Sequence, residues 1–158
     1  MELLQTLVML ACAVDIDSGD RIGDLTPQPL AQEHLGDLCK DIVSSYGARE
    51  DALAKGRAQG LSREAVDRLE EEVLVMMPVV NRALKAIIYM GDDQLKKNSY
   101  WVYFSLVSLI KSESSEVRDK VHAIFATRMS TLVYGQQQQH LTQQQQRDRD
   151  SSTSPAPS

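Results

Sequence analysis

The chain has 158 residues, of which 42% are hydrophobic and 5% aromatic, and 17 basic and 22 acidic residues give a formal net charge of −5. This length allows one folded domain with a single core. Both signs of charge are interspersed and no basic run is longer than Lys96-Lys97, which argues against nucleic-acid binding. No stretch of the sequence is long and apolar enough to predict a transmembrane helix.

The chain opens with a short apolar run at residues 3–14 (LLQTLVMLACAV). One interpretation is a signal peptide cleaved after Ala13, but Glu2 precedes the run and no lysine or arginine does. We therefore expect an internal helix, and since no capping residue precedes it, the helix is typical of the end piece of a longer array of helices. The residues predicted on its buried face are Leu3, Leu7, Leu10 and Val14.

The acidic segment 15–20 (DIDSGD) begins like an EF-hand calcium loop. It departs from that pattern because Asp20 stands where the loop needs glycine and Thr26 where it needs a bidentate glutamate, so we expect an acidic solvent-exposed loop. The cysteines and histidines are scattered without the spacing of a zinc site. We expect reduced core cysteines, surface histidines, and no metal or cofactor; the residues concerned are Cys12, Cys39, His34, His122 and His140.

The charged, alanine-rich segment 47–60 is interpreted as an extension of a helix or a hinge, because its glycines do not lie between a strand and a helix as in a phosphate-binding loop. Ser62 then predicts the start of a long helix that runs to Met90. Pro78 is expected to kink this helix, and Gly91 to end it. Its predicted apolar stripe comprises Val66, Leu69, Val73, Met76, Val80, Leu84 and Ile87.

The next helix is expected to be capped by Asp92 and Asp93. Its segment 100–110 (YWVYFSLVSLI) is apolar on nearly every face, which predicts a core helix covered on more than one side. The aromatic residues of this segment, Tyr100, Trp101, Tyr103 and Phe104, and the neighbouring pair Met76-Met77, are expected to be core residues rather than a stacking or cofactor-binding surface.

After a polar break, Ser114 is the predicted N-cap of a further helix, with Glu116 in its first turn. Its apolar stripe comprises Val117, Val121, Ile124, Phe125 and Leu132. Short links between long helices favour antiparallel neighbours, and helix pairs of about 40 residues are the unit of HEAT and armadillo repeats. The predicted fold is therefore all-α, an end piece of a HEAT-like solenoid over residues 1–134.

Residues 135–158 are rich in glutamine and then in serine and proline. They carry too little apolar surface to offset the entropy of ordering, so we expect a disordered tail. A helical extension or a coiled-coil partner is the alternative that a glutamine tract allows.

No catalytic motif is present. The adjacent carboxylates of Glu70, Glu71 and Glu72 point about 100° apart on a helix and cannot form a facing acid and base pair, so we expect a solvated surface. No nucleophile elbow, Walker loop, dinucleotide-binding motif or Cys–His pair was found. The sequence predicts a protein that is not an enzyme, with no catalytic, cofactor-binding or metal-binding residue.

The blocks LEEEVLVMMPVVNRALKAIIYMGDDQLKKNSYWVYFSLVSLI and SSEVRDKVHAIFATR resemble the C-terminal helical-repeat region of the large brefeldin A-inhibited Arf guanine nucleotide-exchange factors, especially their third, divergent vertebrate member. The resemblance covers about residues 3–132. It implies a helical-repeat region without the catalytic Sec7 domain, contributing packing, autoinhibitory contacts or partner docking to a parent protein that regulates Arf at Golgi and vesicle membranes. It also implies a cytoplasmic location, peripheral to membranes only through that parent.

Three functions are compatible with this pattern. The first is the noncatalytic scaffold fragment of an Arf exchange factor, whose partners would be the remaining repeats and Arf-pathway proteins. The second is an independent helical adaptor that holds a partner helix in a groove between its own helices. The third is a secreted helical-bundle factor, which would require cleavage of the N-terminal run.

Overall fold

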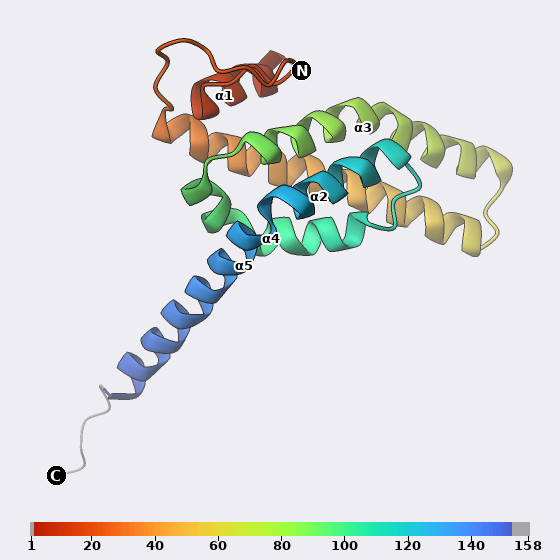
Figure 1. The fold of residues 1–158 in the computed structure, drawn as a ribbon. Coiled ribbons are helices and arrows are strands. Elements are labelled where there is room, and N and C mark those ends of the chain that lie inside the picture. The colour runs from red at the N-terminus through yellow and green to blue at the C-terminus, as the bar shows by residue number, and fades with distance from the viewer. Residues whose placement is uncertain (1, 153–158) are drawn as a thin grey trace.

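The computed structural model describes residues 2–152, and over these residues it consists of five helices and no strand (Figure 1). The predicted all-α class is therefore confirmed for this part of the chain. The helices are α1 (Glu2–Cys12), α2 (Pro29–Ala58), α3 (Arg63–Tyr89), α4 (Asp92–Leu109) and α5 (Ser115–Ser152).

Helix α2 packs against α3 and against α4, and these contacts set the direction of α4. Gly36, in the first part of α2, lies against Gln94 and Asn98 in the first turns of α4. Tyr46, further along α2, lies 3.4 Å from the hydroxyl of Ser112, just beyond the end of α4. Helices α2 and α4 therefore run in the same direction.

Helices α3 and α5 are also in contact and run in the same direction. Arg57 bridges Glu70, in the first part of α3, and Glu113, just before α5. Arg128 of α5 donates a hydrogen bond to the carbonyl oxygen of Ile88, near the end of α3. The core is thus formed by two helix pairs, α2–α3 and α4–α5, stacked on one another. A solenoid needs at least three repeats, so the solenoid part of the prediction is not confirmed.

Helix α1 packs on α2 and α3 through a face that overlaps the predicted one, with Leu7 and Leu10 half-buried against the core. Leu4, Val8 and Ala11 are buried, whereas Leu3 is 62% exposed. The prediction of Leu3 on the buried face was therefore wrong by one position. Helix α1 is so apolar that more than one of its faces could be buried. Packing against α2 and α3 decides which face is covered.

The starts of α3 and α5 agree with the sequence. The hydroxyl of Ser62 accepts a hydrogen bond from the backbone N–H of Ala65 at 3.3 Å, and Ser114 accepts one from Val117 at 3.3 Å. These are N-cap interactions, which satisfy donors that a first helical turn leaves free. The predicted stripe of α3 also faces inward, with Val73, Val80, Leu84 and Ile87 buried. Gly91, rather than Asp92, is the N-cap of α4.

The structure differs from the prediction of a disordered tail beginning at residue 135. Helix α5 continues to Ser152 and its last part leaves the body of the protein as a single helix (Figure 1). All residues from His140 to Ser152 are exposed. The tail prediction is therefore not confirmed for residues 135–152, and its remaining residues, 153–158, lie outside the described part of the chain.

Helix α4 was predicted to be covered on more than one side, and both α2 and α5 pack against it. The prediction that all of its aromatic residues belong to the core was wrong. Val102 and Leu106 are fully buried, but Tyr100 is 63% and Phe104 54% exposed. Helix α5 covers the side that carries Tyr100 and Phe104 only in part, since these two residues line a small hollow together with α5 residues such as Gln136 and Gln139. Trp101 is half-buried against the core, with its indole N–H donating to Asn98 at 2.7 Å.

Candidate functional site

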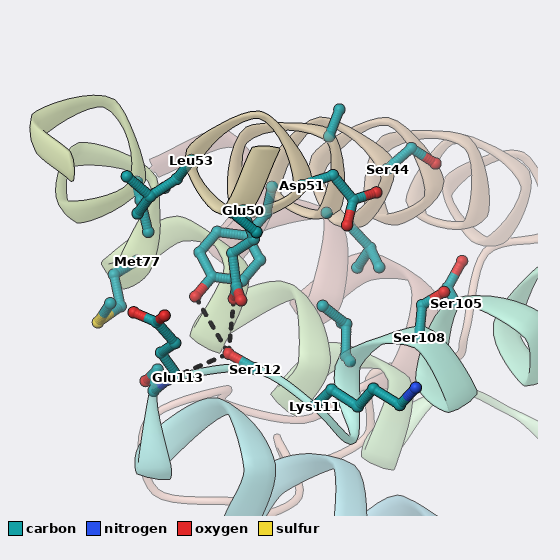
Figure 2. Close-up of a pocket in the computed structure, with 18 of the residues that line it drawn as sticks. Ser44, Glu50, Asp51, Leu53, Met77, Ser105, Ser108, Lys111, Ser112 and Glu113 are labelled. Carbon is teal, nitrogen blue, oxygen red and sulfur yellow. Dashed lines mark hydrogen bonds between the residues drawn. The ribbon is translucent and has the colours of Figure 1, made fainter. Parts of the chain in front are cut away.

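A hollow lies beside the α2–α3 pair, where α4 ends. Helix α4 has 18 residues, against 30 in α2 and 27 in α3. The outer part of the first helix pair is therefore left uncovered, and a groove of about 1390 Å³ forms between α2, α3, α4 and the turn at residues 110–114 (Figure 2).

Small side chains form the part of the groove that lies between α2 and α4. Ser44 projects from α2 and Ser105 and Ser108 from α4, on two sides of the hollow (Figure 2). Gly47 and Ala48 continue this lining on α2. A β-carbon added at Gly47 would meet no atom within 4 Å, so the groove has room above its backbone there. Small residues of this kind allow a second backbone to approach closely.

Large apolar side chains border the groove and are open to solvent. Leu74 of α3 is 62% exposed, and Phe104 and Val107 of α4 are 54% and 44% exposed. Buried Leu53 and half-buried Met77 lie at the end of the groove nearest the α2–α3 tip. An exposed apolar surface rimmed by polar groups is typical of an interaction site.

The charged residues that line the groove are mostly acidic. The only two basic ones are Arg57 and Lys111. Arg57 is already held by two carboxylates, at 2.6 Å from Glu70 and 2.7 Å from Glu113, and these hydrogen bonds raise its pKa. The groove therefore presents a net negative charge. Its acidic residues are Glu50, Asp51, Glu70, Glu113 and Glu116.

A hydrogen-bonded cluster around Ser112 sets the position of the α4–α5 turn against α2. The buried hydroxyl of Ser112 donates to Glu50 at 2.6 Å and lies 3.4 Å from the Tyr46 hydroxyl (Figure 2). The Ser112 hydroxyl also accepts a hydrogen bond from the backbone N–H of Ser114, and the Arg118 side chain donates one to the backbone carbonyl oxygen of Ser112. Burial, together with the Glu50 carboxylate, raises the pKa of Tyr46, so this phenol stays neutral near neutral pH.

The residues considered for metal or redox chemistry do not meet in this groove. His34, His122 and His140 are exposed and separate from it. Cys39 is buried, with its thiol 3.8 Å from the carbonyl oxygen of Ala83. Within residues 2–152, no three His, Cys, Asp or Glu side chains are grouped so that they could hold a metal ion.

Cys12 and Cys39 are both free cysteines. Burial raises the pKa of Cys12 to about 11, an effect that the nearby Arg128 partly offsets. Burial and the neighbouring Cys12 raise the pKa of Cys39 to about 12. Both side chains are therefore protonated thiols near neutral pH and poor nucleophiles.

The acidic segment 15–20 is exposed at Asp17, Ser18 and Asp20, as predicted, and it is also attached to α3. Asp17 forms an ion pair with Arg82 at 2.9 Å, and its carbonyl oxygen accepts from Lys85 at 3.1 Å. Ile16 is fully buried.

Of the three adjacent glutamates, Glu70 binds Arg57 while Glu71 and Glu72 are exposed, so their side chains do not converge.

The sequence suggested a groove between helices but not which residues line it, because each helix was considered by itself. The signal was present as small residues three or four apart on two helices, namely Ser44, Gly47 and Ala48 on α2 and Ser105 and Ser108 on α4. Such spacing places them on one face of each helix. That the two faces border one hollow depends on the parallel packing of α2 and α4.

None of the helices described in residues 2–152 is long and apolar enough to cross a membrane. No curated protein matches the chain, and no solved structure does. Residues 3–126, which include every residue that lines the groove, match the family model of the BIG2 C-terminal domain.

This match corrects the family predicted from the sequence. The matched family is described as the BIG2 C-terminal domain and not as the helical-repeat region of the third Arf exchange factor. The Arf, Golgi and vesicle-traffic roles depended on that resemblance alone, and they are withdrawn with it. On the match over residues 3–126, the chain belongs to the BIG2 C-terminal domain family.

Proposed function

We propose that this protein is a noncatalytic helical adaptor that holds an amphipathic, basic helix of a partner protein in the groove. The observation that carries the proposal is the combination of exposed Leu74, Phe104 and Val107 with a mainly acidic lining. An amphipathic helix buries its apolar face in such a groove and leaves its polar flanks at the rim.

The shape of the groove supports a helix as the ligand. Small residues of α2 and α4 lie along the hollow, and the apolar side chains of Leu74 and Phe104 border it. A helix backbone can approach the small residues while its own apolar side chains pack against Phe104. Exposed aromatic residues are frequent anchors of binding energy in protein interfaces.

The charge of the groove selects a basic partner. Asp51 is exposed and Glu50 half-buried on one side, and Glu116 is exposed near the other. Lysine or arginine on the flanks of a bound helix would pair with these carboxylates, which increases the association rate and disfavours acidic helices. No histidine or cysteine lines the groove, which supports binding rather than catalysis.

Fluorescence anisotropy tests the proposal with two labelled peptides of about 18 residues, long enough for five helical turns. Both carry leucine at i, i+4 and i+7, and their flanking positions are lysine in one and glutamate in the other. We expect the lysine peptide to bind, with an affinity that falls as salt increases. Equal binding of both peptides, or of neither, would contradict the proposal.

Two neighbouring residues of α3 provide a matched pair of variants. Leu74 lines the groove, whereas Val75 is 69% exposed and does not line it. Leu74→Asp should weaken binding of the lysine peptide about 10-fold or more, while Val75→Asp should leave it unchanged. Asp51→Lys should weaken binding as well, and Glu71→Lys, on an exposed residue outside the groove, is its control.

A further inference from the structure

Helix α5 presents a long surface that nothing in the proposed function uses. Its buried side carries Val117, Val121, Ile124 and Leu132. The opposite side is exposed from Ala123 through Gln144, both on the body of the protein and along the part that leaves it. The exposed residues three or four apart on this outer face of α5 are Ala123, Ala126, Ser130, Val133, Gln137, His140 and Gln144.

The outer face of α5 is uncharged over an unusual length. Arg128 is the only acidic or basic residue between His122 and Gln146, counting histidine as neutral. Its side chain is turned toward α3 and α4, where it contacts the carbonyl oxygen of Ile88 and the carboxylate of Asp92. The outer face therefore offers no ionic contact to a charged ligand, in contrast to the groove.

The same face combines apolar and amide side chains. Met129 is 37%, Val133 41%, Tyr134 50% and Leu141 59% exposed. Gln137 and Gln144 lie on the same face, and a glutamine amide is both a donor and an acceptor of hydrogen bonds. An uncharged face of this composition is complementary to itself.

The part of α5 after His140 is exposed at every residue up to Ser152 and leaves the body of the protein (Figure 1). The turn before it still contacts α4, where Gln139 donates a hydrogen bond to the carbonyl oxygen of Lys97 at 3.4 Å. The part after His140 is polar nearly all round, and a helix of this kind needs many i, i+4 side-chain pairs or contacts with another helix to be stable in water. It also projects away from the body, so a second molecule can lie along it without meeting α1–α4.

We propose that the outer face of α5 is a self-association surface, on which two copies of the chain pair through antiparallel α5 helices. This inference goes beyond the proposed adaptor function and does not depend on it. Residue size favours the antiparallel direction, because the half on the body carries small side chains such as Ala126 and Ser130, and the projecting half carries larger ones such as Leu141 and Gln144. Across a two-fold axis at Gln137, Gln144 of one copy then faces the small Ser130 of the other, and Leu141 faces Val133.

Sedimentation velocity on the full chain over about a 100-fold range of concentration tests the proposal, because dimer formation follows mass action. We expect a reversible dimer. A species that stays monomeric at the highest concentration would overturn the inference.

Two pairs of charge substitutions separate the outer face from the rest of the projecting helix. Val133→Glu with Gln137→Glu puts like charges opposite each other in the dimer and should weaken it about 10-fold or more. Thr142→Glu with Gln146→Glu adds the same charge to exposed positions on the other side of the helix and should leave the dimer intact. Equal effects of the two pairs would overturn the assignment of the surface, and circular dichroism confirms that all variants remain helical.

The direction of pairing has its own test. Ser130→Glu with Gln144→Lys in one chain places opposite charges together in the antiparallel dimer, so its association should be retained or strengthened and become sensitive to salt. A parallel dimer would instead place like charges together, and loss of association by this variant would overturn the antiparallel arrangement. Binding of the basic peptide in the groove should be unchanged in all of these variants, so that failure of the dimer and failure of the adaptor function can be distinguished.

Discussion

Gly135 of α5 lies so close to Ser99 of α4 that a β-carbon at position 135 would come within 2.7 Å of the Ser99 hydroxyl oxygen. The same β-carbon would lie 2.8 Å from the carbonyl oxygen of Lys96 and 2.9 Å from its α-carbon. The absence of a side chain at Gly135 therefore allows α5 to cross the beginning of α4, just before it leaves the body of the protein.

Replacing Gly135 with alanine should destabilise the protein. The backbone of Lys96 cannot move aside as the end of a flexible side chain could, so the two helices must separate. We expect a loss of about 1–3 kcal/mol in the free energy of unfolding, which is typical of overpacking. Urea denaturation followed by circular dichroism at 222 nm measures it.

Gly47 is the matched control for this substitution. It lies inside α2, and a β-carbon there would meet no atom within 4 Å. Gly47→Ala should therefore stabilise the protein by about 0.5–1 kcal/mol, because alanine loses less conformational entropy than glycine in a helix. If both substitutions had the same sign, the close crossing at Gly135 would not explain the first result.

Two neighbouring residues of α4 should respond very differently to truncation. Leu106 is fully buried, so Leu106→Ala should lower the free energy of unfolding by about 2–5 kcal/mol. Phe104 is 54% exposed, so Phe104→Ala should cost less than about 1 kcal/mol, although it should impair peptide binding in the groove. Denaturant unfolding compares the two, and an equally large loss at Phe104 would mean that a further element covers this side of α4.

Removing the hydroxyl of Ser112 should loosen the α4–α5 turn. Ser112→Ala leaves Glu50 without the donor 2.6 Å away and the buried Tyr46 hydroxyl without its neighbour at 3.4 Å. We expect a loss of about 1–3 kcal/mol, the usual consequence of leaving a buried polar group unpaired. Hydrogen exchange measured by mass spectrometry should show faster exchange at residues 110–116, and unchanged exchange there would contradict the role of this cluster.

Stability should fall at alkaline pH. Burial raises the pKa of Cys12 from 9.0 to about 11 and that of Cys39 to about 12. The unfolded chain therefore loses these protons first, and the free energy of unfolding should decrease between about pH 9 and pH 12, by at most about 1.4 kcal/mol per pH unit for each thiol. Below pH 9 this contribution is fully present.

The cysteine contribution can be isolated with Cys39→Ala. This variant keeps a small apolar side chain at the site and should show a shallower loss of stability over the same pH range. Tyr46, whose pKa is also raised, still titrates in it. An unchanged slope would show that the buried thiol does not contribute.

The stretches that sequence reasoning predicted correctly are those governed by local chemistry. The hydroxyls of Ser62 and Ser114 cap the helices that follow them, because an N-cap bond joins residues only three apart. The apolar stripe of α3 is buried as predicted because its apolar residues are concentrated on one face of the helix, which leaves only one face suited to the core. The groove could not be predicted in the same way, since Gly47 and Ser105 are far apart in the chain and become neighbours only through packing.

The family expected from the sequence also required correction, to the BIG2 C-terminal domain over residues 3–126. When segments of two amphipathic helices have similar sequences, the similarity reflects mainly the spacing of their apolar residues. Many helical proteins share that spacing. The functional proposals therefore depend on the groove and on the outer face of α5 rather than on the resemblance.

The amino-acid sequence by itself determined that this protein is helical and where its two capped helices begin, because periodicity and capping act within one or two helical turns. Only the tertiary structure decided which apolar residues are covered. Leu4 rather than Leu3 is buried because α2 and α3 contact that side of α1, and Phe104 remains 54% exposed because α5 only borders its side of α4. Burial depends on the length and direction of neighbouring helices, and the open groove exists because α4 is shorter than the pair on which it packs.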